Sequence, residues 1–391
     1  MMQRLIWRRW LKSWAPPNPL KATKAYTIPT RRPSGRRGFA ERRPLEILDH
    51  IGSVFADFSN PKKRVFFGYL LLTILIALVW LVAVRRASIR AALHEVFDRK
   101  VLFSASSLAD YKIFVINRVF TMFISPLLVS QLAIATALYY ALHDVDFLQR
   151  GLFAGTPKGV IIALFTATIF VVDDLTKYLM HRWMHRWPLL WAIHKVHHSA
   201  ETMTPITVYR VHPLEGVLYG LRAAVAQGTV MASFLFFFGN AVDLHTVLGV
   251  NILSFVFHVT GSNLRHSHIS IRYWRWLEHL LISPAQHQVH HSIAREHHDK
   301  NFGVAFAVWD WMFGSLHLSE QGRKLKFGLK ASEAHPSRLL DIYFRPFGDM
   351  ARYLRRRARR LHERLRPQAA RNSAASGRDK PIPAVARTDP G

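Results

Sequence analysis

The sequence predicts an all-α integral membrane protein with about four transmembrane helices in two hairpins, a further N-terminal hydrophobic helix, and a cytosolic helical cap. Two observations predict this class. Half of the 391 residues are hydrophobic, and they gather in long uncharged runs separated by basic segments, as in multi-pass membrane proteins. Histidines cluster where these runs end, at the helical spacings i, i+3 and i+4. We therefore expect the cap to hold a histidine-ligated site for two metal ions.

The composition excludes several classes of site and partner. The chain has no cysteine, so disulfides, thiolate catalysis and cysteine-ligated zinc or iron–sulfur sites are excluded, and any metal must be held by histidine and carboxylate. The formal net charge is +28. Because membrane spans are expected, anionic lipid head groups or an acidic protein partner are the favoured counter-charges, and no nucleic-acid partner is expected.

The N-terminal part is expected to form a basic tail followed by membrane helices. Residues 1–65 are rich in Arg, Lys and Pro and are expected to be mostly disordered. Residues 66–159 contain the uncharged run Phe66–Val84, which is long enough to span a bilayer, and a second spanning run, Phe120–Leu142, with Pro126 near its start. Basic residues flank Phe66–Val84 on both sides, so loop charge does not orient it, and a re-entrant helix remains the alternative.

The central part is expected to supply the remaining spans. Val160–Val172 begins a helix that turns polar at Asp173 and is expected to continue out of the bilayer to His181. Val217–Phe238 and Leu244–His258 are expected to form a hairpin. Their connector, "GNAVD", lacks Lys and Arg and should face away from the cytoplasm. The histidine-rich segments, which basic residues flank, are therefore expected on the cytoplasmic side.

Residues 318–366 are expected to complete the cap with a basic amphipathic helix. At helical spacing, and opposite most of "RRRARR", the chain carries Met350, Leu354, Ala358, Leu361 and Leu365. This pattern suits a membrane-surface helix and equally a solvated helix docked on the domain. Residues 367–391 are a low-complexity tail that is expected to be disordered.

Three histidine clusters carry the expected chemistry. The segment "HRWMH" places His181 and His185 at i and i+4. The segments "HKVHH" and "HQVHH" repeat H-x-x-H-H with His194, His197, His198, His287, His290 and His291. These eight neutral imidazoles exceed the four ligands of one zinc ion and suit two metal ions with positions left open. Imidazole suits iron, zinc, copper and nickel alike, so the pattern leaves the metal undecided.

The position of the clusters at helix ends favours chemistry on a lipid, because a lipid chain can reach a site at the bilayer surface from the side. A zinc metalloprotease would need H-E-x-x-H, but Asp98 stands at the second histidine position after His94, and Arg366 stands there after His362. A histidine-rich membrane protein that binds or transports metal without redox catalysis remains the alternative. Such a protein would place its ligands in mid-span.

Other polar residues are candidates to complete or orient the metal ligands. Asp174 and Tyr178 share a helical stripe with the first histidine cluster, so the carboxylate or the phenol is expected to orient a ligating imidazole. The alternative is that Asp174 only caps the membrane exit. His258, at the end of the last apolar run, is a further candidate ligand. His266 and His268 in "NLRHSHI" compete with it.

Residues 160–317 resemble the fatty acid hydroxylase superfamily, which includes sterol desaturases, fatty-acid and sphingolipid hydroxylases, and alkylglycerol monooxygenase. The resemblance rests on the ordered set H-x-x-x-H, H-x-x-H-H and H-x-x-H-H. Five segments stand in the family's order: "DLTKYLMHRWMH", "LWAIHKVHHS", "RVHPLE", "ISPAQHQVHHS" and "DKNFGVAFAVWDWMFGS". The resemblance implies a catalytic domain with a non-haem di-iron site on a cytosolic cap above about four transmembrane helices.

The resemblance also implies roles for individual residues. The family's metal-binding boxes match, by position, His181, His185, His194, His197, His198, His287, His290 and His291. Its additional ligand region matches His258, with His266 and His268 as competitors. The closing stretch of the family pattern matches Asp299, Asn301, Trp309, Asp310 and Gly314, which makes Asp299 a candidate to support the last box.

The activity implied by the resemblance is the oxidation of a lipid. Two ferrous ions would use dioxygen and external electrons to hydroxylate or desaturate a C–H bond, and zinc can replace iron in purified samples. The lipid classes that remain open are sterol, fatty acyl, sphingolipid, ether lipid and carotenoid. Since the sequence shows no haem- or flavin-binding domain, a separate reductase, ferredoxin or cytochrome is implied as electron donor, and a basic face would attract an acidic one.

Overall fold

The computed structural model describes residues 56–60, 63–124, 128, 130–239, 256, 262–322, 324–330 and 338–365. All of them belong to one compact unit, His50–Gly391. The described residues form helices and no strand, with two isolated bridges, Leu281 to Phe306 and Ser292 to Phe327. The expected all-α class is therefore confirmed. His258, together with most of the predicted span Leu244–His258, lies outside the described residues.

Of the described helices, three are long and apolar enough to cross a membrane: Phe67–Val84, Lys158–Arg186 and Pro213–Phe238. The first consists of α3 (Phe67–Val79), which continues as the π-helical turn η1 (Trp80–Val84). The apolar side chains of this segment pack on α4 (Ile89–Val96) and on the chain around Leu264 and Ile271. The segment that carries the predicted N-terminal hydrophobic helix thus also contacts the histidine-rich part of the molecule.

The prediction of a single spanning helix over Phe120–Leu142 is wrong. Helix α5 (Arg99–Leu102) leads into α6 (Ala105–Ile124), and a separate helix, α7 (Gln131–His143), starts seven residues beyond the end of α6. The hydroxyl of Ser130 caps α7 by accepting a hydrogen bond of 3.1 Å from the amide of Ala133. The physical reason lies in the sequence, because Pro126 has no amide hydrogen and disfavours helix at the preceding residue.

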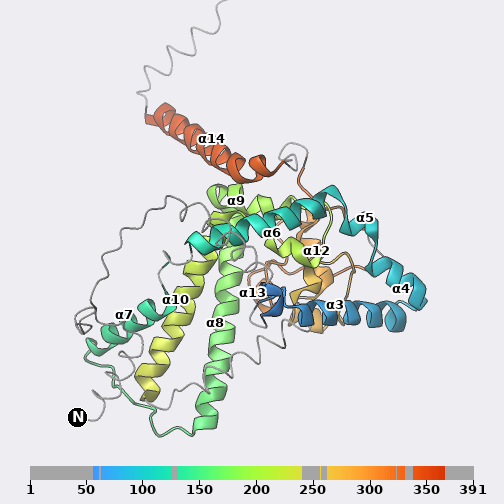
Figure 1. Cartoon of the computed structure of the whole chain (residues 1–391). Coiled ribbons are helices and arrows are strands. Elements are labelled where there is room, and N and C mark those ends of the chain that lie inside the picture. Colours follow the sequence, from blue (N-terminus) through green and yellow to red (C-terminus); the bar gives the residue numbers. More distant parts are fainter. Residues whose placement is uncertain are drawn as a thin grey trace, which may run out of the picture. The chain divides into compact units, whose positions relative to one another are not determined.

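Helices α8 (Lys158–Arg186) and α10 (Pro213–Phe238) run side by side (Figure 1). Their contact is apolar, with Phe165 and Phe234 packed edge to face at 5.1 Å between ring centroids. Helix α8 is 29 residues long and, as predicted, continues past the polar residues after Val172 to His181 and beyond. The same continuous helix therefore joins the apolar contact to the first histidine cluster.

Arg222 lies inside the apolar run of α10, and its charge is neutralised by the neighbouring helix. The guanidinium group lies 3.0 Å from the carboxylate of Asp173 on α8 and donates to the hydroxyl of Thr176 at 2.6 Å. Lys177 forms a second ion pair with the same carboxylate at 2.5 Å. A charge in an apolar helix is costly unless it is paired, so these contacts fix the register between α8 and α10.

Shorter helices pack around the end of α8 that carries the histidines. In chain order they are α9 (Pro188–His198), η3 (Pro205–Tyr209), η6 (Leu264–His266), η7 (Leu277–His279), α12 (Pro284–His290), η8 (Arg295–His297) and α13 (Val308–Met312). Prolines stand at the first position of α9 and α12, where a missing amide hydrogen costs nothing. Ser283 and Gln286 add a capping box at α12, with hydrogen bonds of 2.9 and 3.1 Å.

The predicted C-terminal amphipathic helix is present as α14 (Leu339–Leu365). Its first half is docked, because Ile342 packs with Ile113 and Val196, and Lys195 of α9 forms an ion pair with Asp349. Its second half leaves apolar side chains in contact with solvent, including Leu361, which is 57% exposed. Of the two arrangements expected for this helix, docking on the rest of the domain therefore applies only to its first half.

Candidate metal centre

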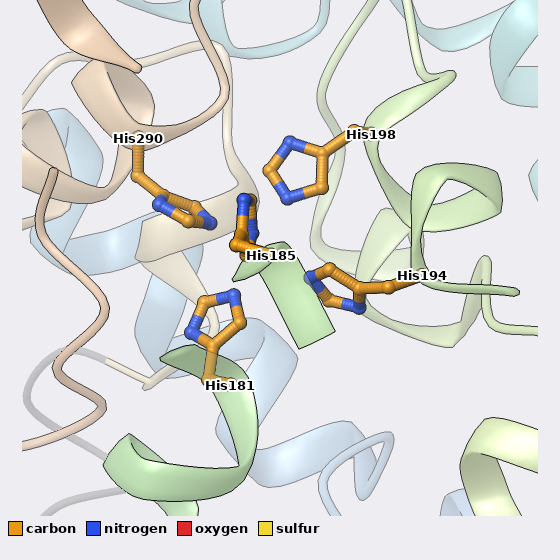
Figure 2. Close-up of side chains that lie close together, drawn as sticks. All are labelled: His181, His185, His194, His198 and His290. Carbon is orange, nitrogen blue, oxygen red and sulfur yellow. The ribbon is translucent and has the colours of Figure 1, made fainter. Parts of the chain in front are cut away.

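The first histidine group consists of five imidazoles from three helices. Its members are His181 and His185 of α8, His194 and His198 of α9, and His290 of α12. One ring nitrogen from each lies within 4.8 Å of the corresponding nitrogen of every other member. Figure 2 shows the five rings turned toward a common space between the helices. Segments more than 100 residues apart in the sequence thus supply one cluster of nitrogen atoms.

The second histidine group consists of His197, His266, His287 and His291, and the same 4.8 Å limit holds for it. The Nε2 atom of His266 lies 3.1 Å from Nε2 of His197 and 3.0 Å from Nε2 of His287. All four side chains are buried. The two groups adjoin, since the ring centroids of His198 and His291 are 4.4 Å apart.

The helical repeat explains how each H-x-x-H-H box serves both groups. In α9, His194 and His198 at i and i+4 belong to the first group, and His197 belongs to the second. In α12 and its C-cap, the pair at i and i+4, His287 and His291, belongs to the second group, and His290 belongs to the first. Residues four apart share a helix face, and the residue between them points to the adjacent face. Each H-x-x-H-H box therefore contributes histidines to both groups.

Hydrogen bonds at Nδ1 determine which nitrogen of several rings is available to a metal. Nδ1 lies 2.8 Å from the carbonyl oxygen of Phe302 in His181 and 2.8 Å from that of Lys300 in His290. In His197 it lies 3.2 Å from the carbonyl oxygen of Arg210. A carbonyl oxygen only accepts, so Nδ1 carries the hydrogen and donates, and Nε2 keeps its lone pair.

Glu215 orients His194 in the same way. Its carboxylate accepts a hydrogen bond of 2.9 Å from Nδ1 of His194, and both side chains are buried. A carboxylate behind a ligating imidazole fixes the ring orientation and raises its basicity. The segment "RVHPLE" alone does not indicate this role for Glu215. The available signal was its place in the first turn of α10, two residues after Pro213.

Several Nε2 atoms of the first group are buried and, within the described part of the chain, have no hydrogen-bond partner: those of His185, His194, His198 and His290. Buried polar atoms without a partner are rare in proteins, because each one costs free energy of desolvation. Converging nitrogen lone pairs at these atoms are what a metal ion coordinates. The residues of both groups therefore fit metal ions held by imidazole nitrogen.

Burial keeps these imidazoles neutral. It lowers the pKa of His194 to about 3. It also lowers well below 6.5 the pKa values of His197, His198, His266, His287, His290 and His291. For most of these rings the neighbouring imidazoles lower the pKa further. A metal ligand must be the neutral ring, so the site is ready to bind a cation without releasing protons.

The expectation that Asp174 orients a ligating imidazole is wrong for the described part of the chain. Its carboxylate accepts from the amides of Ala305 and Phe306 at 2.8 and 3.0 Å and from Nε1 of Trp309 at 3.0 Å. The reason is distance along the helix, since seven residues separate Asp174 from His181, or about 10 Å at the α-helical rise. Asp174 is buried and braces the 305–309 segment, so it does more than cap a helix end.

Tyr178 and Asp310 contact residues on either side of that segment. The hydroxyl of Tyr178 accepts from Arg182 at 2.8 Å and lies 3.1 Å from that of Ser315, so Tyr178 contacts no imidazole by hydrogen bond within the described residues. The carboxylate of Asp310 accepts from the amides of Phe302 and Gly303 at 2.9 and 2.7 Å. The hydrogen bonds of Asp310 hold Phe302 in place, and the carbonyl oxygen of Phe302 accepts from Nδ1 of His181.

Among the other described candidates, neither His268 nor Asp299 belongs to either group. Nε2 of His268 lies 2.7 Å from the carbonyl oxygen of Glu95, so this ring is turned away from the second group. Asp299 is exposed, in the left-handed region at φ 57°. His258 lies outside the described residues, and the further histidine that the structure brings into the second group is His266.

Comparisons with known proteins identify a family and several relatives. Residues 166–315 match the family model described as fatty acid hydroxylase. The β-carotene hydroxylase of Paracoccus sp. is 30% identical over 145 residues, which are 36% of this chain and 80% of that protein. The alkylglycerol monooxygenase of Danio rerio is 26% identical over 174 residues, 44% of this chain and 34% of that protein. The Delta(7)-sterol 5(6)-desaturase of Eremothecium gossypii is 26% identical over 176 residues, 44% of this chain and 43% of that protein.

These matches differ in extent. The chain spans about a third of the length of the alkylglycerol monooxygenases that it matches and most of the length of the β-carotene hydroxylase. No solved structure matches the chain. The match to the family model, residues 166–315, contains the three histidine boxes. The chain belongs to the fatty acid hydroxylase superfamily.

Proposed function

We propose that this protein is an integral membrane di-iron oxidoreductase that hydroxylates or desaturates a C–H bond of a lipid, such as a sterol, a fatty acyl chain or a sphingolipid. The observation that carries the proposal is the pair of adjoining histidine groups, whose buried, neutral imidazoles present nitrogen lone pairs to two common spaces. The names of the relatives, a monooxygenase, a hydroxylase and a sterol desaturase, support the class of reaction.

In this proposal each histidine group holds one ferrous ion. The first ion is held by His181, His185, His194, His198 and His290, and the second by His197, His266, His287 and His291. His258 stays a proposed additional ligand. Bound iron supplies the oxidising power, drawn from dioxygen, that an unactivated C–H bond requires.

The chain's own residues orient these ligands and keep water out. Carbonyl oxygens of Phe302, Lys300 and Arg210 and the carboxylate of Glu215 hold Nδ1 hydrogens, so Nε2 faces inward. The imidazoles of the second group are buried, which excludes bulk solvent from their common space. Hydroxylation then needs two electrons and two protons per dioxygen, with one oxygen atom entering the lipid and the other leaving as water.

We further propose a multi-pass protein with about four spans and the histidine boxes on the cytoplasmic side. The proposed parts are a disordered tail at 1–65, membrane helices at 66–159, the catalytic domain at 160–317, a C-terminal cap at 318–366 and a tail at 367–391. The candidate spans α3–η1, α8 and α10 support a membrane protein, and basic residues near the boxes, such as Lys195 and Arg210, support the orientation.

The electrons are proposed to come from a separate reductase, ferredoxin or cytochrome. The net charge of +28 favours an acidic donor, because complementary charge increases the rate of encounter. Zinc in place of iron is expected to leave the site filled and the oxidation inactive, since zinc has no redox chemistry.

The test compares lipids and metals in cells that express the intact chain, His197→Ala, or the control His362→Ala. His197 belongs to the second group, whereas His362 lies on the exposed end of α14. We expect a lipid that has gained one oxygen atom, or lost two hydrogen atoms, with the intact chain and the control but not with His197→Ala. Indistinguishable lipid profiles at equal protein levels would refute oxidation, and metal uptake without lipid change would favour a transporter.

A further inference from the structure

Helix α3 and its continuation η1 carry no charged residue, and the described part of the chain covers only one of their faces. The covered face has a buried residue at every fourth position: Tyr69, Thr73, Ala77 and Leu81. The opposite face carries an exposed apolar stripe, with exposed fractions between 53 and 64%: Phe67, Leu71, Leu75 and Val79. A helix that faces water carries polar side chains on its outer face, so the exposed stripe requires an apolar environment.

The first end of α3 is held beside the second histidine group. Just before the helix, the guanidinium of Arg64 donates to the carbonyl oxygen of Ser262 at 2.7 Å. In return, the side-chain amide of Asn263 donates to the carbonyl oxygen of Arg64 at 3.1 Å. Because Asn263 stands three residues before His266, this end of α3 lies on the side of the protein that carries the histidines.

The far end of the same helix is held by the same part of the chain. There, Ala77 and Leu81 pack with apolar residues on either side of His266: Leu264, Ile269 and Ile271. After η1, helix α4 brings the carbonyl oxygen of Glu95 to 2.7 Å from Nε2 of His268. A helix of 18 residues is about 27 Å long, so a helix that crossed the bilayer would carry its far end away from this segment. The covered face instead lies along it.

The contacts of this segment lead to the point where α8 turns polar. Leu264, which packs on α3–η1, precedes Arg265, whose guanidinium donates to the carbonyl oxygen of Val304. The next residue, Ala305, donates to the carboxylate of Asp174 at 2.8 Å. Asp174 stands where the apolar run of α8 ends, and in Figure 1 the axis of α3 runs across that of α8. These contacts connect α3–η1 to the membrane boundary of α8.

We propose that α3–η1 lies in the plane of the bilayer surface, with the exposed stripe in the acyl part of one leaflet, and does not cross the membrane. Exposed basic residues at both ends, Lys63, Arg85 and Arg86, then meet the anionic head groups of the same leaflet. A crossing helix would place one of these basic ends on the far side, against the positive-inside rule. The inference goes beyond the proposed oxidation and depends only on α8 as a span.

The first experiment determines on which side of the membrane each end of α3–η1 lies. Because the chain has no cysteine, single cysteines can be placed on exposed residues of the full-length protein. Ser59→Cys and Arg90→Cys flank α3–η1, Arg295→Cys marks the histidine side, and Ala154→Cys marks the other end of α8. An impermeant maleimide is added to sealed membrane vesicles before and after permeabilisation. We expect the first three to react from one side and Ala154→Cys from the other.

The second experiment measures the depth of the exposed stripe with spin labels in vesicles of phosphatidylcholine and phosphatidylglycerol. Labels at Phe67→Cys, Leu71→Cys and Leu75→Cys are expected at one shallow depth, in contact with oxygen and shielded from a water-soluble nickel complex. In a crossing helix, the depth would change by about 6 Å from each of these positions to the next. Val160→Cys and Leu164→Cys are the matched controls, because these exposed residues of α8 should show that step.

Four results would overturn the proposal. Ser59→Cys and Arg90→Cys could react from opposite sides, or the depth could change stepwise along the stripe; either result means that α3–η1 crosses. Contact of the stripe labels with the nickel complex would place the stripe in water. Broadening by neighbouring spins would show that a second copy of this chain covers it.

Failure of the proposed function gives a different result. If Ala154→Cys reacts from the histidine side, or the controls on α8 show no step in depth, then α8 is not a span, whereas equal shallow depths along the stripe still support α3–η1 in the bilayer surface. Neither measurement uses turnover. A lack of lipid oxidation would therefore count against the reaction and leave the position of α3–η1 unchanged.

Discussion

His266 and His268 stand two residues apart, yet their rings make unrelated contacts. The short helix η6 ends at His266, whose Nε2 atom lies about equally close to two imidazoles of the second group. The chain leaves η6 in an extended conformation at Ser267, and His268 turns to the carbonyl oxygen of Glu95. By their spacing in the sequence, both residues are equal candidates for metal ligands. The local backbone conformation is therefore what turns one ring toward the second group and the other ring away from it.

These two residues provide a matched pair of variants. We expect His266→Ala to lower the metal content from about two ions per chain to about one, because the second group loses one of its nitrogen ligands. His268→Ala should retain the full content. The measurement is inductively coupled plasma mass spectrometry of protein purified with iron in the medium. Equal metal content in the two variants would show that His266 is not a ligand.

At the scale of elements, one buried arginine joins α6 to α9 and to the second group. The guanidinium of Arg210 pairs with Asp110 of α6, donates to the hydroxyl of Ser199 at 3.0 Å, and donates to the carbonyl oxygen of Ser106 at 2.7 Å. The carbonyl oxygen of the same arginine accepts from His197. Its side chain thus holds two helices while its backbone orients an imidazole.

Removal of the partner charge should therefore destabilise the packing of these elements. We expect Asp110→Ala to lower the free energy of unfolding by about 3–5 kcal/mol, because it leaves the charge of Arg210 buried and unpaired. Glu363→Ala is the control, since its pair with Arg359 on α14 is exposed and contributes about 0–1 kcal/mol. The free energies of unfolding of both variants are measured by denaturation in detergent, with tryptophan fluorescence as the signal. A similar decrease in the two variants would contradict a structural role for the buried pair.

At the scale of the whole molecule, packing gathers neutral imidazoles from α8, α9, η6 and α12 into one buried region. No single element could bury them, because each helix covers only one side of the cluster. The collective result is an interior that binds fewer protons than the unfolded chain does at mildly acidic pH, since burial lowers the histidine pKa values.

Stability without metal should accordingly fall as the pH decreases. Above pH of about 6.5 the rings are neutral in both states. Below it the unfolded chain takes up protons that the folded chain excludes, so each such ring costs up to about 1.4 kcal/mol per pH unit. We expect the thermal midpoint of metal-depleted protein to drop between pH of about 7.5 and 5.5. A midpoint that is constant or higher at the acidic end would contradict neutral, buried imidazoles.

Much of the fold could be predicted because helix and membrane signals are local. The α-helical class, the continuation of α8 to His181 and the helix α14 follow from apolar periodicity along a single segment. The break between α6 and α7 had a local signal as well, in Pro126 and Ser130, but the apolar run outweighed it. The pairing of Arg222 with Asp173 joins two helices across 49 residues of sequence, and periodicity does not specify such pairs.

The chemistry available to this protein can be deduced from its residues alone, because it has imidazoles and no cysteine, and the spacings i, i+3 and i+4 let helices present these rings together. Three features instead depend on the packing of distant segments: the division of the imidazoles into two groups, the inclusion of His266 but not His268, and the support of an imidazole by Glu215 rather than Asp174. The physical reason is that helical spacing specifies the face of one helix, whereas a cluster of nitrogen atoms requires faces of several helices to meet. Their meeting depends on packing between segments far apart in the chain.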